Sequence, residues 1–307
     1  MKFISIVLIT GLLLGMVPVG ASATVTPLST LSAVEELLYG QVQSGALLER
    51  VDRVEQEIYG TTQAGAVLVR IDRVQSFLDV NSSGSASLKL KLNLAEWGFS
   101  ARLTGGQPLV NRLDKIETEL LGAPEQGFLA ERIEQLMMLI WGTTQLDVKA
   151  LELKEQSLVK IRLLSSVDSG ESRVGEDIQY RVIEDVIVEG RVVIPAGSEG
   201  VGTVTEVSSA GMLGRDGRVV IDFGSVPALD GNAIRIKVDE KATEKNRSLE
   251  LAAGASMAGI LLLGPIGLAG GYFIRGRDVD IPAGTEFFVE TERSRRVTGF
   301  LFRPGHN

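Results

Sequence analysis

The stretch Val34–Arg53 reads VEELLYGQVQSGALLERVDR, and the next twenty residues, Val54–Arg73, read VEQEIYGTTQAGAVLVRIDR. The two segments superpose without a gap, and each carries an aromatic residue followed by glycine at the same place, Tyr39-Gly40 and Tyr59-Gly60. Self-similarity at a short fixed period is typical of repeat architectures, in which each unit packs on its neighbours. The sequence therefore predicts an array of repeats, with a period of about 20 residues, in the first half of the chain.

Each repeat is predicted to contain one short amphipathic helix. Its apolar residues recur at the 3.6-residue spacing of one helical face, and the expected helix-repeat core consists of Leu47, Val51, Val54, Ile58, Ile71, Leu113, Ile116 and Ile133. The charged residues between them, such as Arg50 and Glu55, are expected to form a solvated face with intrahelical pairs. Glycine after the aromatic residue accepts the left-handed conformation that ends a helix. Helices this short are not stable alone, so the array has to bury its apolar stripes between units.

The repeat continues further along the chain, but less regularly. Ile116–Gln135 keeps the pattern, Leu136–Glu155 keeps only its start, and Trp97-Gly98 lies where a degenerate aromatic-glycine pair would fall. Between the regular copies, residues 81–94 contain a Ser/Gly-rich tract and the alternating run Leu88–Leu94. The alternation reads as a strand or extended edge, or as an insertion in the helical repeats without a role of its own, and we favour the insertion. This half is interpreted as a spacer or coiled-coil-like array, with a specific ligand groove as the alternative.

The second half of the chain has the pattern of a β domain. The helical period disappears after about Leu158, and the expected strands are Val159–Leu164, Asp177–Val188, Val201–Val207, Arg218–Phe223 and Ala233–Val238. Asp216-Gly217 and Asp230-Gly231 are typical hairpin turns. The motif Ile-Pro-Ala-Gly occurs at 194–197 and again at 281–284, each time before an expected strand. The sequence thus predicts one antiparallel β-barrel or sandwich, and an α+β multidomain fold for the whole chain.

The β domain is interrupted by Leu251–Ile274, 24 residues without a charged side chain. Gly264-Pro265 breaks this run near its middle, and the strands on either side are expected in one sheet, so we expect a helical hairpin rather than a single membrane crossing. Each arm would be about 15 Å long, against a bilayer core of about 30 Å. Shallow membrane insertion or self-association is expected, with burial against the β domain as the alternative. The expected contact residues are Gly254, Gly259, Leu262, Leu263, Gly264, Pro265, Gly267, Gly271, Tyr272 and Phe273.

The N-terminus and the composition indicate an exported, acidic protein. Residues 1–23 combine Lys2, an apolar run and the small triplet Ala21-Ser22-Ala23, a pattern typical of a cleavable signal peptide, with a retained anchor as the alternative. The chain has no cysteine and a single histidine, His306, so we expect no catalytic residues, metal site or cofactor. With 31 basic and 39 acidic residues the net charge is −8, which argues against nucleic acid as a partner. The expected location is the periplasm, the outer membrane or the cell surface.

These observations divide the chain into four expected parts. They are a signal peptide (1–23), a helical repeat region with the Ser/Gly insertion (24–156), a β-rich domain that holds the apolar insertion 251–274 (157–297), and a tail (298–307).

The second half resembles the β-barrel domain of TrbI-like scaffold proteins of bacterial conjugation and type IV secretion channels. The residues that carry the resemblance are Val159–Leu164 with Ser165 and Ser166, Gly175-Glu176-Asp177 with Val182 and Val186, Val193–Ser198 with Gly200 and Gly202, and Ile281–Thr285 with Phe288-Val289. In that family a helical hairpin precedes the last strands and oligomerises in the outer membrane, and Leu251–Ile274 occupies the comparable place. The family also has a cytoplasmic N-terminus and an inner-membrane helix, where this chain has a signal-like segment and helical repeats. Those repeats resemble the helical repeats of uncharacterised bacterial envelope proteins.

Three functions follow as hypotheses. The first is a non-enzymatic envelope protein, in which the repeats form a spacer or assembly module and the β domain meets a membrane, another envelope protein or its own copies through 251–274. The second is a soluble adhesin or ligand-binding module, for which the basic cluster Arg293–Arg296 is a candidate contact. The third is a cell-wall hydrolase that uses paired carboxylates, for which Glu184-Asp185 and Asp278/Asp280 are the candidates. We favour the first and expect the protein not to be an enzyme.

Overall fold

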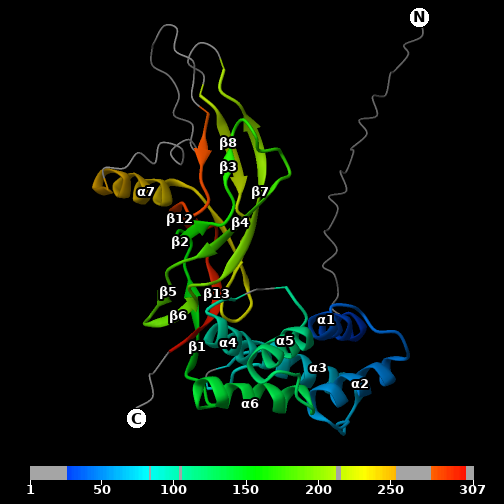
Figure 1. Cartoon of the computed structure of the whole chain (residues 1–307). Coiled ribbons are helices and arrows are strands. Elements are labelled where there is room, and N and C mark those ends of the chain that lie inside the picture. The colour runs from blue at the N-terminus through cyan, green and yellow to red at the C-terminus, as the bar shows by residue number, and fades with distance from the viewer. Residues whose placement is uncertain (1–25, 83, 104–105, 212–215, 254–277, 302–307) are drawn as a thin grey trace, which may run out of the picture.

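The computed structural model describes residues 26–82, 84–103, 106–211, 216–253 and 278–301. These residues form a helical region followed by a mainly β region (Figure 1). The helical region contains α1 (Pro27–Tyr39), α2 (Leu47–Tyr59), α3 (Val67–Asp79), α4 (Leu88–Ser100), α5 (Leu109–Leu121) and α6 (Leu129–Trp141), each 13 residues long. The predicted α+β multidomain fold is confirmed.

Four of these helices end as the repeat pattern predicts. After α1, α2, α5 and α6 the chain turns at Gly40, Gly60, Gly122 and Gly142, all in the left-handed conformation. The Trp97-Gly98 pair, in contrast, lies inside α4, which runs on to Ser100. A Cβ at Gly98 would come within 2.7 Å of Ile140 Cγ2 in α6. This glycine therefore allows two helices to pack closely and does not end one.

The alternating run Leu88–Leu94 lies in α4 and is a complete helix of the array, neither a strand nor an insertion. Its leucines alternate with polar residues, yet Leu88, Leu90, Leu92 and Leu94 are all buried. Such burial is possible because α4 is covered by α3, α5 and α6 and also contacts the β region. A helix buried on several sides does not need a single apolar stripe, so its periodicity was misleading.

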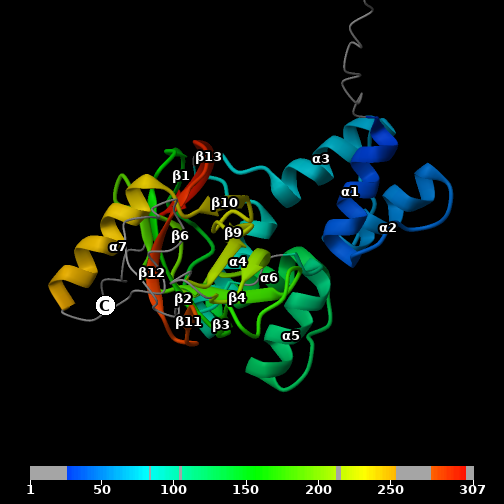
Figure 2. The same ribbon diagram turned by 90° about the horizontal axis from the view of Figure 1, so that it is seen from above.

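The six helices form two three-helix units, which we call the first unit (α1–α3) and the second unit (α4–α6). Within the units α1 packs on α3 and α4 packs on α6, and the units meet through α1 with α5, α2 with α6 and α3 with α4. The second unit lies beside the β region, and the first unit lies farther from it (Figure 2).

One apolar core runs through both units. Val51, Val54, Ile58, Ile71, Leu113, Ile116 and Ile133 are buried in it, and Leu47 is partly buried against it. Four residues from beyond α6 enter the same core: Leu146, Val148, Leu229 and Phe300. The helical core is thus completed by side chains of the β region.

The β region consists of antiparallel strands in curled sheets. One sheet has the order β1-β13-β6-β5, a second has the order β8-β7-β4-β2-β12-β10-β9, and β11 pairs with β3. The strands are β1 (Val148–Leu153), β2 (Leu158–Leu163), β3 (Val167–Asp168), β4 (Asp177–Val182), β5 (Val186–Val188), β6 (Arg191–Ile194), β7 (Glu199–Ser208), β8 (Arg218–Asp222), β9 (Ser225–Pro227), β10 (Ala233–Lys237), β11 (Asp280–Ile281), β12 (Glu286–Thr291) and β13 (Arg295–Phe300). Their inward residues form a second apolar core.

The curl of the large sheet depends on small residues in β7. A Cβ at Gly200 would lie 2.3 Å from the Tyr180 ring, and one at Gly202 would lie 2.9 Å from the Asp222 carbonyl oxygen. The buried Tyr180 hydroxyl donates to the Phe223 carbonyl oxygen at 2.6 Å, and burial raises the pKa of this phenol. Glycines at alternate positions of β7 therefore make room for β4 and for the turn that follows β8.

The strand bounds differ from the expected ones in two places. The segment expected as one strand over Asp177–Val188 is divided by a bend between β4 and β5. In addition, β1 starts before residue 157 and β13 extends past residue 297, and the two strands pair with each other. The β region thus closes on its own first and last strands.

Candidate functional site

The expected membrane or oligomer contacts, Gly254 to Phe273, lie outside the described residues. The chain on either side of them is described, and both flanks are held on the β region. On one side the flank is α7 (Glu240–Ala253), which packs on β12. Among the residues that the structure describes, no helix is both long and apolar enough to cross a membrane.

A side-chain amide fixes α7 to the sheet. Asn246 Nδ2 donates to the Phe288 carbonyl oxygen at 2.9 Å, and the Phe288 amide donates to Asn246 Oδ1 at 2.7 Å. The pair reproduces the two hydrogen bonds that a neighbouring strand would make. Near the start of the helix, the Ala242 amide donates to the buried Glu290 carboxylate at 2.7 Å.

The other flank is fixed by Asp278. Its Oδ1 accepts from the Ser169 hydroxyl at 2.9 Å and from the Ala210 amide at 2.7 Å. Directly after it, the Val279 amide donates to Ser169 Oγ at 2.9 Å, and Asp280 in β11 pairs with Asp168 in β3. The chain thus leaves and re-enters the same β region at two anchored points.

Three of the four carboxylates considered for hydrolysis, Glu184, Asp185 and Asp278, have structural partners. Glu184 and Asp185 lie in the bend after β4 rather than in a strand; Glu184 binds Lys160 at 2.7 Å, and Asp185 Oδ1 accepts from the Ala196 amide at 2.6 Å. Asp278 is engaged as described above. Across the described ranges, no group of three or more histidine, cysteine or acidic residues could hold a metal ion.

The charged residues of the helical repeat form buried ion pairs between helices. Glu35 in α1 receives two hydrogen bonds from the Arg50 guanidinium in α2, from Nε at 2.9 Å and from Nη2 at 2.6 Å. The same Glu35 carboxylate accepts the Gln43 amide of the connecting loop at 2.9 Å. We call this arrangement of glutamate, arginine and loop amide a clasp. It joins two helices and the loop between them.

The glutamate–arginine pair of the clasp recurs at fixed helix positions, counted from the first residue of each helix. Position 9 supplies the glutamate, position 4 of the next helix supplies the arginine, and position 6 of the first helix supplies a second acceptor. The pairs are Glu35–Arg50, Glu55–Arg70, Glu96–Arg112 and Glu117–Arg132. The second acceptors are Ser32, Asp52, Asn93 and Asp114. Between α3 and α4 the same positions hold Gln75 and Lys91, and Lys91 binds Glu134 instead. The glutamate–arginine pair is thus replaced at the boundary between the two units, between α3 and α4.

The prediction of a solvated charged face was wrong for the arginines and glutamates of the clasps, although Glu49 and Arg53 on the same helix are exposed. The four arginines and three of the glutamates, Glu35, Glu55 and Glu117, are buried. Hydrogen bonds to Glu35 raise the pKa of Arg50, and those to Glu55 and Asp52 raise that of Arg70. For Arg132, burial alone lowers the pKa, but the bonds to its carboxylates outweigh burial and the pKa is raised. Arg50, Arg70 and Arg132 therefore stay charged inside the array, where their carboxylate partners make burial tolerable.

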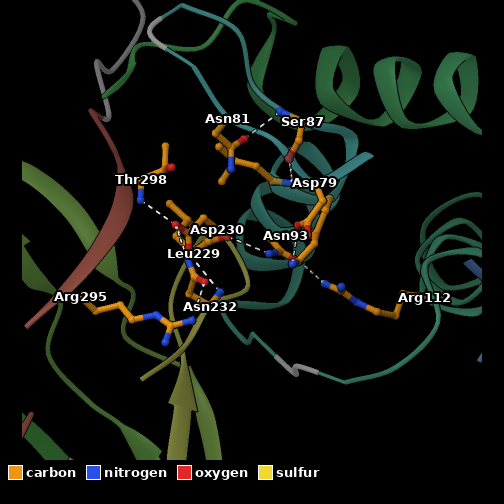
Figure 3. Close-up of polar contacts among 12 residues, drawn as sticks. Asp79, Asn81, Ser87, Asn93, Arg112, Leu229, Asp230, Asn232, Arg295 and Thr298 are labelled. Carbon is orange, nitrogen blue, oxygen red and sulfur yellow. Dashed lines mark hydrogen bonds and ion pairs between the residues drawn. The ribbon is translucent and has the colours of Figure 1, made fainter. Parts of the chain in front are cut away.

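The second unit is docked on the β region through Asn93 (Figure 3). Asn93 Oδ1 accepts from Arg112 Nη2 at 2.7 Å, as the acidic residue at this position does in other clasps. Its Nδ2 donates to the Leu229 carbonyl oxygen at 2.7 Å. A carboxylate has no donor to offer there. Asparagine therefore lets one residue serve both the clasp and the contact between regions.

The hairpin turn that receives Asn93 is itself fixed. Leu229 is buried in the helical core, and Asp230 Oδ2 accepts from the Thr298 amide of β13 at 2.6 Å. Asp230 also accepts from the Asn232 amide at 3.0 Å. The Asp230-Gly231 pair predicted as a hairpin turn thus lies between β9 and β10 and faces the helices (Figure 3).

A second turn of the β region also contacts the second unit. We call the contacts of Asn93 and Trp97 with these two turns the joint. Trp97 Nε1 donates to the Ala196 carbonyl oxygen at 3.0 Å, in the first Ile-Pro-Ala-Gly motif. A Cβ at Gly197 would lie 2.0 Å from the Ala101 carbonyl oxygen, so only glycine fits. Leu103 then forms an isolated parallel bridge with Ser198. At the second copy of the motif, a Cβ at Gly284 would meet nothing within 4 Å. Only the first copy is used for docking.

Comparison with known proteins adds little. No family model matches the chain, and no curated protein sequence matches it. Among solved structures, the chain is similar to ComB10 of the Com type IV secretion system of Helicobacter pylori, with 13% identity, a TM-score of 0.27, and coverage of 49% of this chain and 97% of that one. A likeness of this size decides neither fold nor function.

Sequence reasoning missed the role of Asn93, Trp97 and Asp230 in the contact between the second unit and the β region. A signal for Asn93 was present, because it replaces the acidic residue found at the same repeat position in Asp52 and Asp114. Trp97 also departs from the repeat, since it precedes the end of its helix by three residues. The departures of Asn93 and Trp97 from the repeat pattern thus lie at the surface of the second unit that contacts the β region.

Proposed function

We propose that this protein is a non-enzymatic protein of the bacterial cell envelope. The helical repeats form an assembly module joined firmly to the β region, and the β region associates with a membrane or oligomerises through Leu251–Ile274. The signal-like residues 1–23 support export. The proposed binding partners are other envelope proteins or further copies of the chain.

One observation carries the proposal: the uncharged segment starts and ends at anchored points of one β region. The Asn246–Phe288 pair holds the incoming chain, and the Asp278–Ser169 contact holds the outgoing chain. A single crossing would put these two anchors on opposite sides of a bilayer, which one folded region does not allow. Both anchors are compatible with a segment that begins and ends on the same side of the membrane and that contacts either the membrane or other copies of the chain.

The engaged carboxylates support the non-enzymatic part of the proposal. Glu184, Asp185 and Asp278 each serve an ion pair or a backbone amide that shapes a turn. A hydrolytic pair needs two carboxyl groups that face one substrate, about 5–10 Å apart. Glu184 and Asp185 are directed to different partners in the bend.

The proposal is tested by membrane fractionation of the whole chain and of a variant in which 254–273 is replaced by a Gly/Ser linker of equal length. The linker keeps both anchors, and circular dichroism checks that the variant is folded. We expect the whole chain to sediment with membranes or to require detergent, and the variant to be soluble. A control at an exposed apolar residue of the β region, Ile187→Ser in β5, should behave as the unaltered chain does. The proposal would be overturned if the whole chain were freely soluble and monomeric and if replacing the segment changed neither property.

A further inference from the structure

The contact between the two units joins helix ends to helix starts. The end of α1 meets the start of α5, and the end of α2 meets the start of α6. A Cβ at Gly40 would lie 2.7 Å from Pro108, and one at Gly60 would lie 2.8 Å from Phe128. The contact therefore consists of the glycine ends of one consecutive helix pair and the first turns of another.

The first turns of α2 and α3 are open to solvent. Their second residues, Leu48 and Leu68, are 50% and 53% exposed. At the same position of α5 and α6, Val110 and Ala130 are partly buried against the common core. We call Leu48 and Leu68 the start face. The open starts thus carry larger apolar side chains than the covered starts do.

The ends of α5 and α6 are open as well. A Cβ at Gly122 or at Gly142 would meet no described atom within 4 Å. In the last turns of α6, Met138 is 53% exposed and Leu139 is 59% exposed. We call these four residues the end face. Because repeat arrays ordinarily finish in polar outer surfaces, two exposed apolar faces indicate contact surfaces.

The end face is apolar at the place where an incoming helix start lies. In the covered contact, Gln56 and Glu57 line one groove together with the incoming Phe128. They are positions 10 and 11 of α2, and at the same positions α6 has Met138 and Leu139. The positions beside an incoming start are thus polar in the covered contact and apolar in the open one, which suits the leucines of the start face.

The clasps hold the open helix pairs in the same way as the covered ones. The pairs that join α1 to α2, α2 to α3 and α5 to α6 are Glu35–Arg50, Glu55–Arg70 and Glu117–Arg132, at 2.6, 2.6 and 2.5 Å. The ends of α5 and α6 are therefore held like those of α1 and α2, and the starts of α2 and α3 like those of α5 and α6. The end of α4 is occupied, because Gly197 lies against the Ala101 carbonyl group there.

We propose that the start face of one copy of this chain binds the end face of a second copy. The start of α2 rests on the end of α5 in the other copy, and the start of α3 rests on the end of α6. This arrangement repeats the contact that the starts of α5 and α6 make with α1 and α2 within the chain. Because the two faces differ, each bound copy keeps one free face, and further copies add in a row. The contact uses the helical array alone and goes beyond the proposed role of segment 251–274.

The contact is tested by cross-linking full-length single-cysteine variants in detergent, since the chain has no cysteine of its own. With a short bis-maleimide, Leu68→Cys and Leu139→Cys chains should form a covalent dimer when mixed, and neither should cross-link to itself. The control mixture is Val174→Cys with Leu139→Cys, because Val174 is exposed in the β region, and it should give no product. Cross-linking of Leu68→Cys to itself would show contact through identical faces and overturn the proposal.

Charge substitutions test whether the two faces make the contact. Leu48→Glu in the Leu68→Cys chain, or Met138→Glu in the Leu139→Cys chain, should lower the yield of the mixed dimer at least about tenfold. The control Ile187→Glu in β5 should leave the yield unchanged, and circular dichroism checks that each variant is folded. If lipid or another protein covers the faces, the mixture gives no covalent dimer. That result, or a yield that survives both substitutions, would overturn the proposal.

Replacing 254–273 by the Gly/Ser linker separates this contact from the proposed function. The linker should leave the cross-link between positions 68 and 139 unchanged, although it is expected to abolish membrane association. A cross-link that disappears with the segment would contradict the head-to-tail contact.

Discussion

In the first unit of the helical array, Ser32 and Asp52 at position 6 serve the clasp, and in the second unit Asn93 at the same position serves the clasp and also holds the β region. Ser32 and Asp52 bind the arginine of the next helix, whereas Asn93 binds Arg112 with its oxygen and the Leu229 carbonyl with its nitrogen. The first turns of α2 and α3 leave Leu48 and Leu68 exposed, whereas Leu109 and Leu129 in the first turns of α5 and α6 are buried. A repeat thus acquires different roles through single changes at fixed positions, while the clasp keeps the shared architecture.

The largest effect is expected from breaking a clasp in either unit. Glu35→Ala leaves the buried Arg50 guanidinium without its carboxylate and should lower the free energy of unfolding by about 3–5 kcal/mol. Glu36→Ala is the matched control, since Glu36 is exposed on the next position. Urea unfolding measures the free energy of unfolding of both variants. If the two variants are equally stable, the clasp does not hold the array together.

The corresponding substitution in the second unit should affect a larger part of the structure. Glu117→Ala removes the partner of Arg132 and should cost a similar about 3–5 kcal/mol. Because the second unit carries the joint, amide hydrogen exchange should also rise around Leu229, where Glu35→Ala leaves it unchanged. Equal exchange around Leu229 in Glu35→Ala and Glu117→Ala would mean that the two units unfold together. The two units would then not differ in their coupling to the β region.

A smaller effect is expected from Asn93→Asp. The carboxylate keeps an acceptor for Arg112 but loses the donor to the Leu229 carbonyl, so the joint should weaken by about 1–3 kcal/mol. Hydrogen exchange in β9 and β10 should increase while α1–α3 stay protected. Ser32→Asp is the control in the first unit: it adds an acid beside Arg50, as Asp52 does beside Arg70, and should not destabilise the chain. Unchanged protection in Asn93→Asp would show that this contact does not set the joint.

The smallest effect is expected from adding a clasp where there is none. Gln75→Glu with Lys91→Arg places both partners at the α3–α4 boundary, but the α4 arginine would face Glu134 in α6, as Lys91 does. We expect a coupling below about 0.5 kcal/mol in a double-mutant cycle. A coupling of about 3 kcal/mol would mean that the boundary between the units is set by sequence at these two positions.

The repeat could be predicted from sequence because it is a local pattern. The helix ends at Gly40, Gly60 and Gly142 follow from the aromatic-glycine pairs, the end at Gly122 follows from the glycine at the same repeat position, and the apolar stripe indicates the core. The hairpin turn at Asp230-Gly231 follows from turn chemistry in the same way. Such features depend on neighbours along the chain.

The misplaced features depend on contacts between distant parts. Leu88–Leu94 has the alternation of a strand, and it is a helix because its leucines are covered from several sides. Gly98 stands where a helix would end, and it serves instead as a point of close packing with Ile140. A periodicity shows which residues are apolar, but not how many neighbours will cover them.

The sequence by itself determined the two-part organisation, the repeat period and the apolar segment 251–274, since each is written in the order of residue types along the chain. The tertiary structure alone decided that Arg50 and Glu35 are a buried pair and that Asn93 and Trp97 hold the β region. The physical reason is that a charged or polar side chain gains its role from the partner that satisfies it after burial. That partner lies in the next helix or in a turn 99 or 136 residues away along the chain.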